Sequence, residues 1–173
     1  MGSQMWVERI GQSSRTPWQL TFDPDVLIIL GSTLSAVWPQ EGCALLLGER
    51  NDAGWHLRSV WPCCNVWQPG LARFQDDASG EERPANSPSR RSRFAIDPRE
   101  QLHAQRWARA RALAVIGSAH SHPQGESIPS IRDRRWLGAP ALMLIQGADH
   151  SLRAWWLEPE AISCFGAVQH TDG

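Results

Sequence analysis

The chain has 173 residues, 42% of them hydrophobic, and a formal net charge of -1. Its length and apolar fraction fit one domain with its own core and exclude a wholly disordered chain. The near-neutral charge gives no bulk electrostatic attraction to nucleic acid or to an anionic membrane. No apolar run approaches the roughly 18 residues of a membrane span, and the N-terminus lacks a secretory signal pattern. We therefore expect a cytoplasmic protein with no nucleic-acid or membrane partner.

Two features of the composition narrow the chemistry. Lysine is absent, so all 17 basic residues are arginine, which excludes Schiff-base chemistry and the lysine of a phosphate-binding loop. The 4 cysteines form neither a C-x-x-C pair nor the spacing of a disulfide framework. We interpret the cysteines as reduced, in keeping with an intracellular location.

The first part of the chain predicts a helix followed by a hairpin. Asp23-Pro24 has the pattern of an N-cap followed by proline at the first helical position. Apolar residues then recur at helical spacing until Pro39. Residues 43–47 form the apolar run of a buried strand, and residues 51–54 have the composition of a turn. Apolar residues then alternate along a second strand at 55–61. We expect residues 41–61 to form a hairpin.

Residues 68–93 differ in composition, being rich in Pro, Ser, Asp, Glu and Arg and poor in apolar residues. This composition predicts a mobile loop. Its basic end, residues 89–93, fits a solvated loop end, and contact with an acidic partner is the alternative.

The second part of the chain alternates helices and strands. The spacing of Asp97, Pro98 and Glu100 predicts a helix over 98–112. An apolar strand follows at 114–118, a helix is expected to start near Ser130, and two further strands are expected at 141–145 and 152–157. The alternation predicts a single α/β or α+β domain without internal repeats, over residues 5–168. Residues 1–4 have the look of a cloning remnant, and 169–173 of a tail.

The strongest functional pattern is His120-Ser121-His122-Pro123, followed by Ser130 and Asp133. Residues i and i+2 of an extended segment point to the same side, so both imidazoles can reach one metal ion. Asp133 belongs to a different element and can complete the ligand set. Three protein ligands leave a fourth position for water, which is the arrangement of a catalytic zinc site.

Such a site also needs residues that move protons and bind the oxyanion. Glu41 is the candidate acid/base, and the Ser130 hydroxyl is the candidate oxyanion donor. Each part has a simpler reading by itself. The two histidines could be a surface or core pair, Glu41 could cap a turn, and Ser130-x-x-Asp133 could be a capping box. A serine can cap while the aspartate ligates, and it is the combination of all five positions that predicts a zinc site.

At these residues the chain resembles the JAMM/MPN (Mov34/PAD-1) zinc metallopeptidases. Their pattern is a glutamate ahead of a strand, then H-[ST]-H-P, a serine and an aspartate, and every position matches. The segment from Glu41 to Gly48 is similar to the family's E-x-C-G-L-L-L-G strand, with Ala44 in place of the usual glycine. The phrase His-Ser-His-Pro-Gln-Gly-Glu-Ser-Ile-Pro-Ser is most similar to the stand-alone prokaryotic branch.

The resemblance implies a cytidine-deaminase-like fold, with a curved mixed β-sheet flanked by helices. It also implies one Zn²⁺ per chain held by His120, His122 and Asp133, with Glu41 as acid/base and Ser130 as oxyanion donor. The implied reaction is hydrolysis of a peptide or isopeptide bond at the C-terminal tail of a ubiquitin-like or sulfur-carrier protein. The loop at 68–93 is placed like the family's first insertion, which helps to seat the substrate tail.

Other functions compete with this one. A non-catalytic MPN-type scaffold shares the fold, although such modules usually lack the ligands. A nucleic-acid role is disfavoured by the net charge, and a zinc nucleobase deaminase by the absence of H-x-E and P-C-x-x-C. Exposed tryptophans and strand edges are compatible with a homodimer, which the sequence does not decide.

Overall fold

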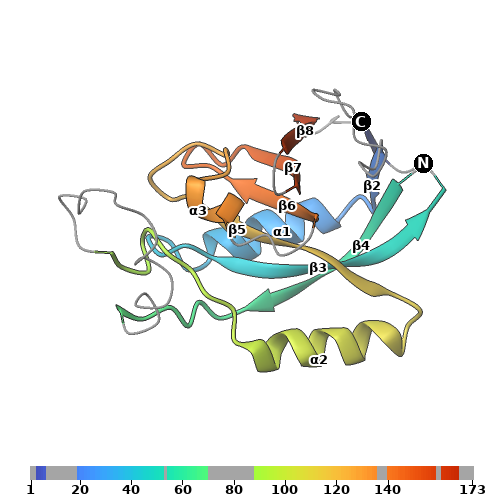
Figure 1. Ribbon diagram of the computed structural model, residues 1–173, viewed down its shortest axis with the longest axis horizontal. Helices are drawn as coiled ribbons and strands as arrows, with labels where there is room; N and C mark the ends of the chain where they lie inside the picture. Colours follow the sequence, from blue (N-terminus) through green and yellow to red (C-terminus); the bar gives the residue numbers. More distant parts are fainter. Residues whose placement is uncertain are drawn as a thin grey trace.

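A mixed sheet of eight strands forms the centre of the described part of the molecule (Figure 1). The structure is a computed structural model that describes residues 3–6, 19–52, 54–69, 88–135, 140–158 and 161–167. In chain order the elements are β1 (Ser3–Trp6), β2 (Gln19–Phe22), α1 (Val26–Ser35), β3 (Cys43–Asn51), β4 (Gly54–Cys63), α2 (Pro98–Arg109), β5 (Ala114–Ser121), α3 (Ile131–Arg135), β6 (Ala141–Gln146), β7 (Leu152–Glu158) and β8 (Ala161–Ala167).

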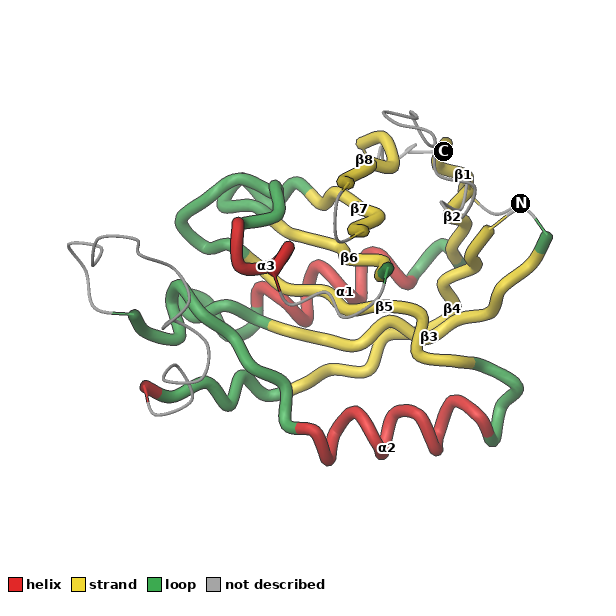
Figure 2. Tube along the Cα trace, in the orientation of Figure 1, coloured by secondary structure: helices red, strands yellow, loops and turns green. Residues whose placement is uncertain are grey.

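The strands lie in the order β1-β2-β4-β3-β5-β6-β7-β8. The pairs β2/β4 and β5/β6 are parallel, and the other neighbouring pairs are antiparallel. The sheet curls so far that its two edge strands, β1 and β8, come into contact (Figure 2). The result is the curved mixed sheet flanked by helices that the family resemblance implied.

Helix α1 covers one face of the sheet with its apolar side. Four of its residues are buried: Val26, Leu27, Leu30 and Leu34. They join a core that includes Leu46, Leu144 and Trp156 of three different strands. This burial of apolar side chains is the main source of the stability of the layer.

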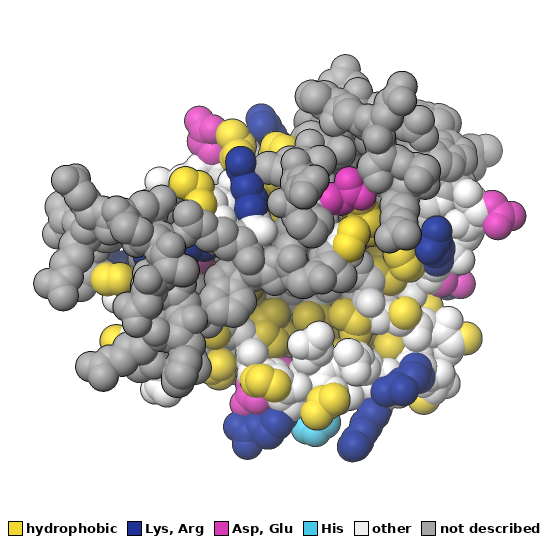
Figure 3. Space-filling model, in the orientation of Figure 1, with side chains coloured by type: hydrophobic (Ala, Val, Ile, Leu, Met, Phe, Trp, Pro, Cys, Tyr) yellow, Lys and Arg dark blue, Asp and Glu magenta, His cyan; other side chains and the backbone are white. Residues whose placement is uncertain are grey.

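Helix α2 packs on the opposite face of the sheet (Figure 1). The buried residues of the helix are small, Ala104 and Ala108, so its backbone can lie close to Leu45 and Leu47 of β3. In Figure 3 basic side chains gather along the lower edge of the view, over α2, and its outward residues include Arg99, Arg106 and Arg109. Strand β3 is therefore covered on both faces, which explains its unbroken apolar run.

A β-bulge in β5 decides which way the histidines point. Leu47 pairs with Val115 and Leu46 with Gly117, so Ile116 is the extra residue. Ile116 lies in the α1 core. Without the bulge, strict alternation would turn His120 toward that same core. The bulge shifts the alternation by one residue, and bulges beside active sites commonly redirect a side chain in this way.

The predicted elements are largely confirmed, with corrections at their boundaries. The start of α1 was predicted wrongly: its N-cap is Asp25, not Asp23, because the Asp23 carboxylate contacts His56 and Arg58 instead. Helix α2 ends at Arg109, short of residue 112, because Ala112 has a φ of 57°. Strands β1, β2 and β8 were not predicted, and most of the predicted loop at 68–93 (residues 70–87) lies outside the described residues.

Candidate metal centre

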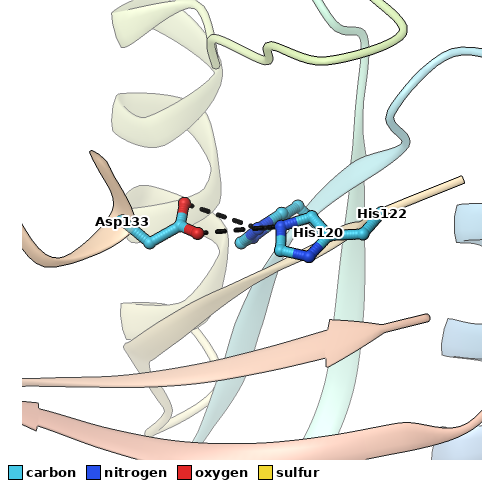
Figure 4. A group of neighbouring side chains, drawn as sticks. All are labelled: His120, His122 and Asp133. Carbon is cyan, nitrogen blue, oxygen red and sulfur yellow. Dashed lines mark hydrogen bonds and ion pairs between the residues drawn. The ribbon is translucent and has the colours of Figure 1, made fainter. Parts of the chain in front are cut away.

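Two imidazoles converge at the end of β5. His120 is the penultimate residue of this strand and His122 comes directly after it. Their Nε2 atoms lie 2.9 Å apart, as the predicted i, i+2 geometry requires (Figure 4). The side chain of His120 is 1% exposed and that of His122 15% exposed, so the pair is held within the protein rather than on a mobile surface.

The ring of His122 has a defined tautomer. Its Nδ1 lies 2.8 Å from the backbone carbonyl oxygen of Glu126. A carbonyl can only accept a hydrogen bond, so Nδ1 carries the proton and the neutral ring presents a bare lone pair at Nε2. Metal-binding histidines usually donate their second ring N–H in this way.

Asp133 approaches both rings from α3. Its Oδ1 lies 3.5 Å from His120 Nε2, and its Oδ2 lies 3.7 Å from His122 Nε2. A reciprocal capping arrangement fixes this carboxylate: the backbone N–H and the hydroxyl of Ser130 both donate to Oδ2 at 2.7 Å, and Asp133 N–H donates to Ser130 Oγ at 3.2 Å. The structure therefore confirms the capping interpretation of Ser130-x-x-Asp133, and it is compatible with the predicted ligand role because the cap also aims Asp133 at the histidines.

The donor set fits a zinc ion. Zinc held tetrahedrally by ligand atoms at 2.0–2.1 Å would space those atoms about 3.3 Å apart. The two Nε2 atoms are 2.9 Å apart, and each has a different oxygen of the Asp133 carboxylate at 3.5 or 3.7 Å. One ligand atom from each residue lies within 4.8 Å of the others, so small side-chain adjustments would bring the three atoms to that spacing. Two imidazole nitrogens and one carboxylate are ligands that zinc prefers, and three of them leave one position open.

The burial of His120 costs folding free energy, which the binding of such an ion would offset. Among the described residues, its Nδ1 is the one buried side-chain nitrogen or oxygen without a hydrogen-bond partner. The ring is instead stacked on Phe94, with ring centroids 4.4 Å apart and an interplanar angle of 21°. A strong interaction at Nε2 would compensate a buried, unsatisfied polar atom.

Glu41 lies just before β3, at the same end of the sheet. The neighbouring Gly42 donates its N–H to Ser121 Oγ at 2.8 Å, which ties this turn to the strand that carries the histidines. Gly42 must be glycine, since a Cβ there would lie 2.4 Å from the backbone oxygen of Leu34. Asn65 donates to the Glu41 carbonyl oxygen at 3.0 Å, so the glutamate is positioned from both sides.

Burial gives the site unusual electrostatics. Desolvation raises the pKa of Glu41 to about 7, against a lowering by the nearby His122. Desolvation also acts to raise the pKa of Asp133, but hydrogen bonds from His120, His122 and Ser130 outweigh it and hold that pKa well below the ordinary value. Asp133 is thus ionised at neutral pH, while Glu41 exchanges its proton there, as a general acid/base must. Cys43, the cross-strand neighbour of His120, has its pKa raised by burial to about 12 and stays a thiol.

The sequence of residues 25–158 matches the model of the prokaryotic homologues of the JAB domain. The chain belongs to this family. The match confirms the resemblance to the prokaryotic branch of the JAMM/MPN group and covers the candidate metal centre with Glu41. Family membership establishes the kind of domain. Metal binding, catalysis and the choice of substrate depend on this chain's own residues.

Solved structures support the fold of this JAB domain. A protein from Desulfitobacterium hafniense, solved in solution, superimposes with a TM-score of 0.65 and 23% identity, over 84% of this chain and 88% of the other. A protein from Salinibacter ruber (strain DSM 13855) gives a TM-score of 0.56 and 23% identity, over 87% and 92% of the two chains. A comparison with curated proteins gives no significant match. Among the described residues, no helix has the length and apolar character needed to cross a membrane.

A cavity of about 680 Å³ opens beside the metal centre of the JAB domain. Glu41, His122, Ser130 and Asp133 line it, so four of the five predicted site residues share one space. The rest of its lining is mostly apolar or basic, including Trp67, Phe94, Ile96, Met143, Arg91, Arg93 and Arg132. Its volume is in the usual range for a ligand site.

Three site features were not found from the sequence. Phe94 was not predicted as a site residue, yet its ring stacks on His120. The Glu126 carbonyl that orients His122 is a backbone group and leaves no sequence signal. Asn65 bonds through its side chain to Glu41, Arg93, Ala95 and Trp67, and its position after a strand is the one clue that the sequence offered.

Proposed function

We propose that this protein is a zinc-dependent metallopeptidase. It would hydrolyse a peptide or isopeptide bond at the C-terminal tail of a ubiquitin-like or sulfur-carrier protein. One observation carries the proposal: His120, His122 and Asp133 converge within 4.8 Å of one another, in a cavity that Glu41 also lines.

His120, His122 and Asp133 would hold the ion. A zinc ion bound there lowers the pKa of its water to about 7 and polarises a carbonyl group. The chain's own residues do the remaining work. With a pKa of about 7, Glu41 takes a proton from the attacking water when it is ionised, and it then delivers that proton to the leaving amine.

Ser130 is the proposed donor to the oxyanion. Its hydroxyl proton is directed at Asp133 Oδ2, so the hydroxyl must rotate toward the substrate oxygen as negative charge develops. The backbone N–H of Ser130 also donates to Asp133, and the carboxylate therefore keeps one capping bond while the hydroxyl turns. Loss of one such donor costs about 10²–10³ in rate in other enzymes.

The substrate class rests on family membership and on the shape of the cavity. The apolar side chains that line the cavity, among them Phe94 and Met143, suit a short extended peptide. The substrate's tail would enter this space and place its last peptide bond beside Glu41.

The test combines metal analysis with cleavage. The purified protein is expected to contain close to one zinc per chain, and to cleave a ubiquitin-like or sulfur-carrier protein fused to a short C-terminal extension. Cleavage is followed by intact mass, and a chelator should stop it. Glu41→Gln should keep the zinc and lose at least about 10²-fold in rate.

Glu49→Gln is the matched control, because Glu49 lies on β3 with a half-exposed side chain. It should cleave like the wild type. A protein that binds no zinc, or a Glu41→Gln variant with full activity, would overturn the proposal and favour a non-catalytic scaffold.

A further inference from the structure

Three consecutive carbonyl groups of the loop after His122 each accept a hydrogen bond. The carbonyl of Gly125 accepts from Ala148 N–H at 2.8 Å, and that of Glu126 accepts from His122 Nδ1 at 2.8 Å. The carbonyl of Ser127 accepts from the indole Nε1–H of Trp155 at 2.9 Å. The middle carbonyl orients a candidate metal ligand, and the carbonyls on both sides of it are held by the β6–β7 hairpin.

The turn between β6 and β7 packs closely against the loop that follows His122. Ser151 Oγ donates to Asp149 Oδ1 at 2.6 Å and lies 3.1 Å from Ser127 Oγ. A Cβ on Gly147 would lie 2.9 Å from Asp149 Oδ1 and 3.0 Å from Ser127 N. Ser127 is 2% exposed, so these contacts are shielded from competing water.

We propose that Trp155 is a positioning residue, which fixes the aim and tautomer of His122 through the Ser127 and Glu126 peptide groups. This inference rests on the proposed function for its metal, but it assigns a role outside the ligand set. If the indole N–H is removed, the Ser127 carbonyl is released and the adjoining Glu126 carbonyl loses its fixed direction. His122 Nδ1 then loses its defined acceptor, and the ring no longer presents Nε2 in one state.

The neighbouring tryptophan supplies a matched control. Trp155 pairs with Met143 on the cavity side of the sheet, whereas Trp156 lies in the core under α1. The indole of Trp156 donates to Glu158 Oε1 at 3.3 Å, away from the ligand loop. Trp155→Phe and Trp156→Phe remove the same N–H from adjacent residues, and only the first touches this network.

The experiment has two readouts besides activity. The first is zinc affinity, measured by competition with a chromophoric chelator, together with the visible spectrum of the Co²⁺-substituted protein. Trp155→Phe should bind zinc about 10-fold more weakly, in line with losses seen for outer-shell changes elsewhere, and should show an altered Co²⁺ spectrum. Trp156→Phe should match the wild type in both.

The second readout needs no metal. Long-range ¹H–¹⁵N NMR of the zinc-free protein identifies which ring nitrogen of His122 carries the proton. At a pH at which the ring is neutral, the wild type and Trp156→Phe should show Nδ1–H alone, and Trp155→Phe a mixture of tautomers. Ser151→Ala, which removes the hydroxyl next to Ser127, should change both readouts less but in the same direction, and it replaces Trp155→Phe if that variant does not fold.

The experiment distinguishes a failure of the proposed function from a failure of the role inferred for Trp155. A wild type that binds no zinc refutes the proposed function, and the NMR readout still decides the role of Trp155. A folded Trp155→Phe variant with wild-type zinc affinity, Co²⁺ spectrum and Nδ1–H tautomer overturns the inference.

Discussion

At the scale of single residues, the burial of Glu41 gives its carboxyl a pKa suited to proton transfer, and it lowers the stability of the folded chain at neutral pH. Burial raises its pKa from the ordinary 4.5 to about 7. Between these pH values the folded chain holds a proton that the unfolded chain has released, so stability falls as the pH rises through this window. Above about pH 7 the loss is complete, and 2.5 pKa units correspond to about 3 kcal/mol at most.

This argument predicts that Glu41→Gln stabilises the zinc-free protein at pH 8 by up to about 3 kcal/mol. At pH 4, where the wild-type carboxyl is protonated in both states, the two proteins should be equally stable. Urea unfolding at the two pH values measures the difference, with Glu49→Gln as the control. Equal stability at pH 8 would show that the pKa of Glu41 is not raised.

Ser130 allows a second prediction, because its capping and catalytic roles differ in their effects. Ser130→Ala removes the cap of α3 and should cost about 1 kcal/mol in unfolding free energy. Loss of its bond to Asp133 should also weaken zinc binding. If the hydroxyl also stabilises the oxyanion, kcat should fall by about 10²–10³ even at saturating zinc. A fall in kcat that is fully restored by excess zinc would mean that Ser130 only positions Asp133.

The sequence revealed the side chains of this site better than the contacts that orient them. His120 and His122 were predictable because alternation along a strand places them on one side, and Ser130 and Asp133 because capping has a fixed spacing. The Glu126 carbonyl and the Phe94 stack were not predictable. Every residue has a carbonyl, and stacking depends on how the 88–97 segment passes over β5.

At the scale of the elements, the segment after β4 ties the site together through one amide. Asn65 Nδ2 donates to the carbonyls of Glu41 and Arg93, at 3.0 and 2.9 Å. Its Oδ1 accepts from the backbone N–H groups of Trp67 and Ala95, at 3.1 and 3.2 Å. A single side chain therefore joins Glu41, the proposed general acid/base, to the wall of the cavity.

We expect Asn65→Asp to cost about 3 kcal/mol, since a carboxylate cannot donate to the two carbonyls and repels them. The variant should also raise KM, because the cavity wall at Arg93 and Ala95 loses its anchor. Asn51→Asp is the control, because Asn51 Oδ1 accepts from Gly54 N–H and a carboxylate oxygen fills that role equally well. Denaturant unfolding and steady-state kinetics provide the measurements, and an Asn65→Asp variant as stable as Asn51→Asp would contradict this role.

Element types were easier to predict than the face that each residue shows. The apolar run at 114–118 correctly predicted a strand. A regular strand would nevertheless place Ile116 and His120 on the same face, and they point to opposite faces because of the bulge at Ile116. Nothing in the residue types there distinguishes a bulged strand from a regular one, since the cause is the register with β3.

At the scale of the whole molecule, zinc binding should stabilise the fold. An ion that binds only the folded chain adds about 2.7 kcal/mol at a concentration of 100 Kd. We predict a rise in Tm on adding zinc that a chelator reverses, measured by differential scanning fluorimetry. Asp133→Asn should abolish most of this rise, whereas Asp52→Asn, at an exposed turn residue, should retain it. A rise of equal size in both variants would place the bound zinc elsewhere.

The single domain of α/β or α+β class followed from the alternation of helices and strands, and the curved mixed sheet followed from the family resemblance. The pairing of the sheet did not follow, because parallel partners such as β2 and β4 are far apart in the sequence. Leu20 lies opposite Trp55 in that pair, a contact between short segments with no local signal. The catalytic activity, the substrate and the oligomeric state stay predictions until they are measured.

The burial of β3 on both faces of the sheet has a consequence for how the protein unfolds. Glu41 precedes this strand, and His120 lies directly across the strand pair from its first residue, Cys43. Amide hydrogens in the buried part of β3, residues 43–48, should therefore exchange with solvent only when the whole molecule opens. Loss of turnover in increasing denaturant should coincide with loss of tryptophan fluorescence, so that no folded but inert species accumulates between them.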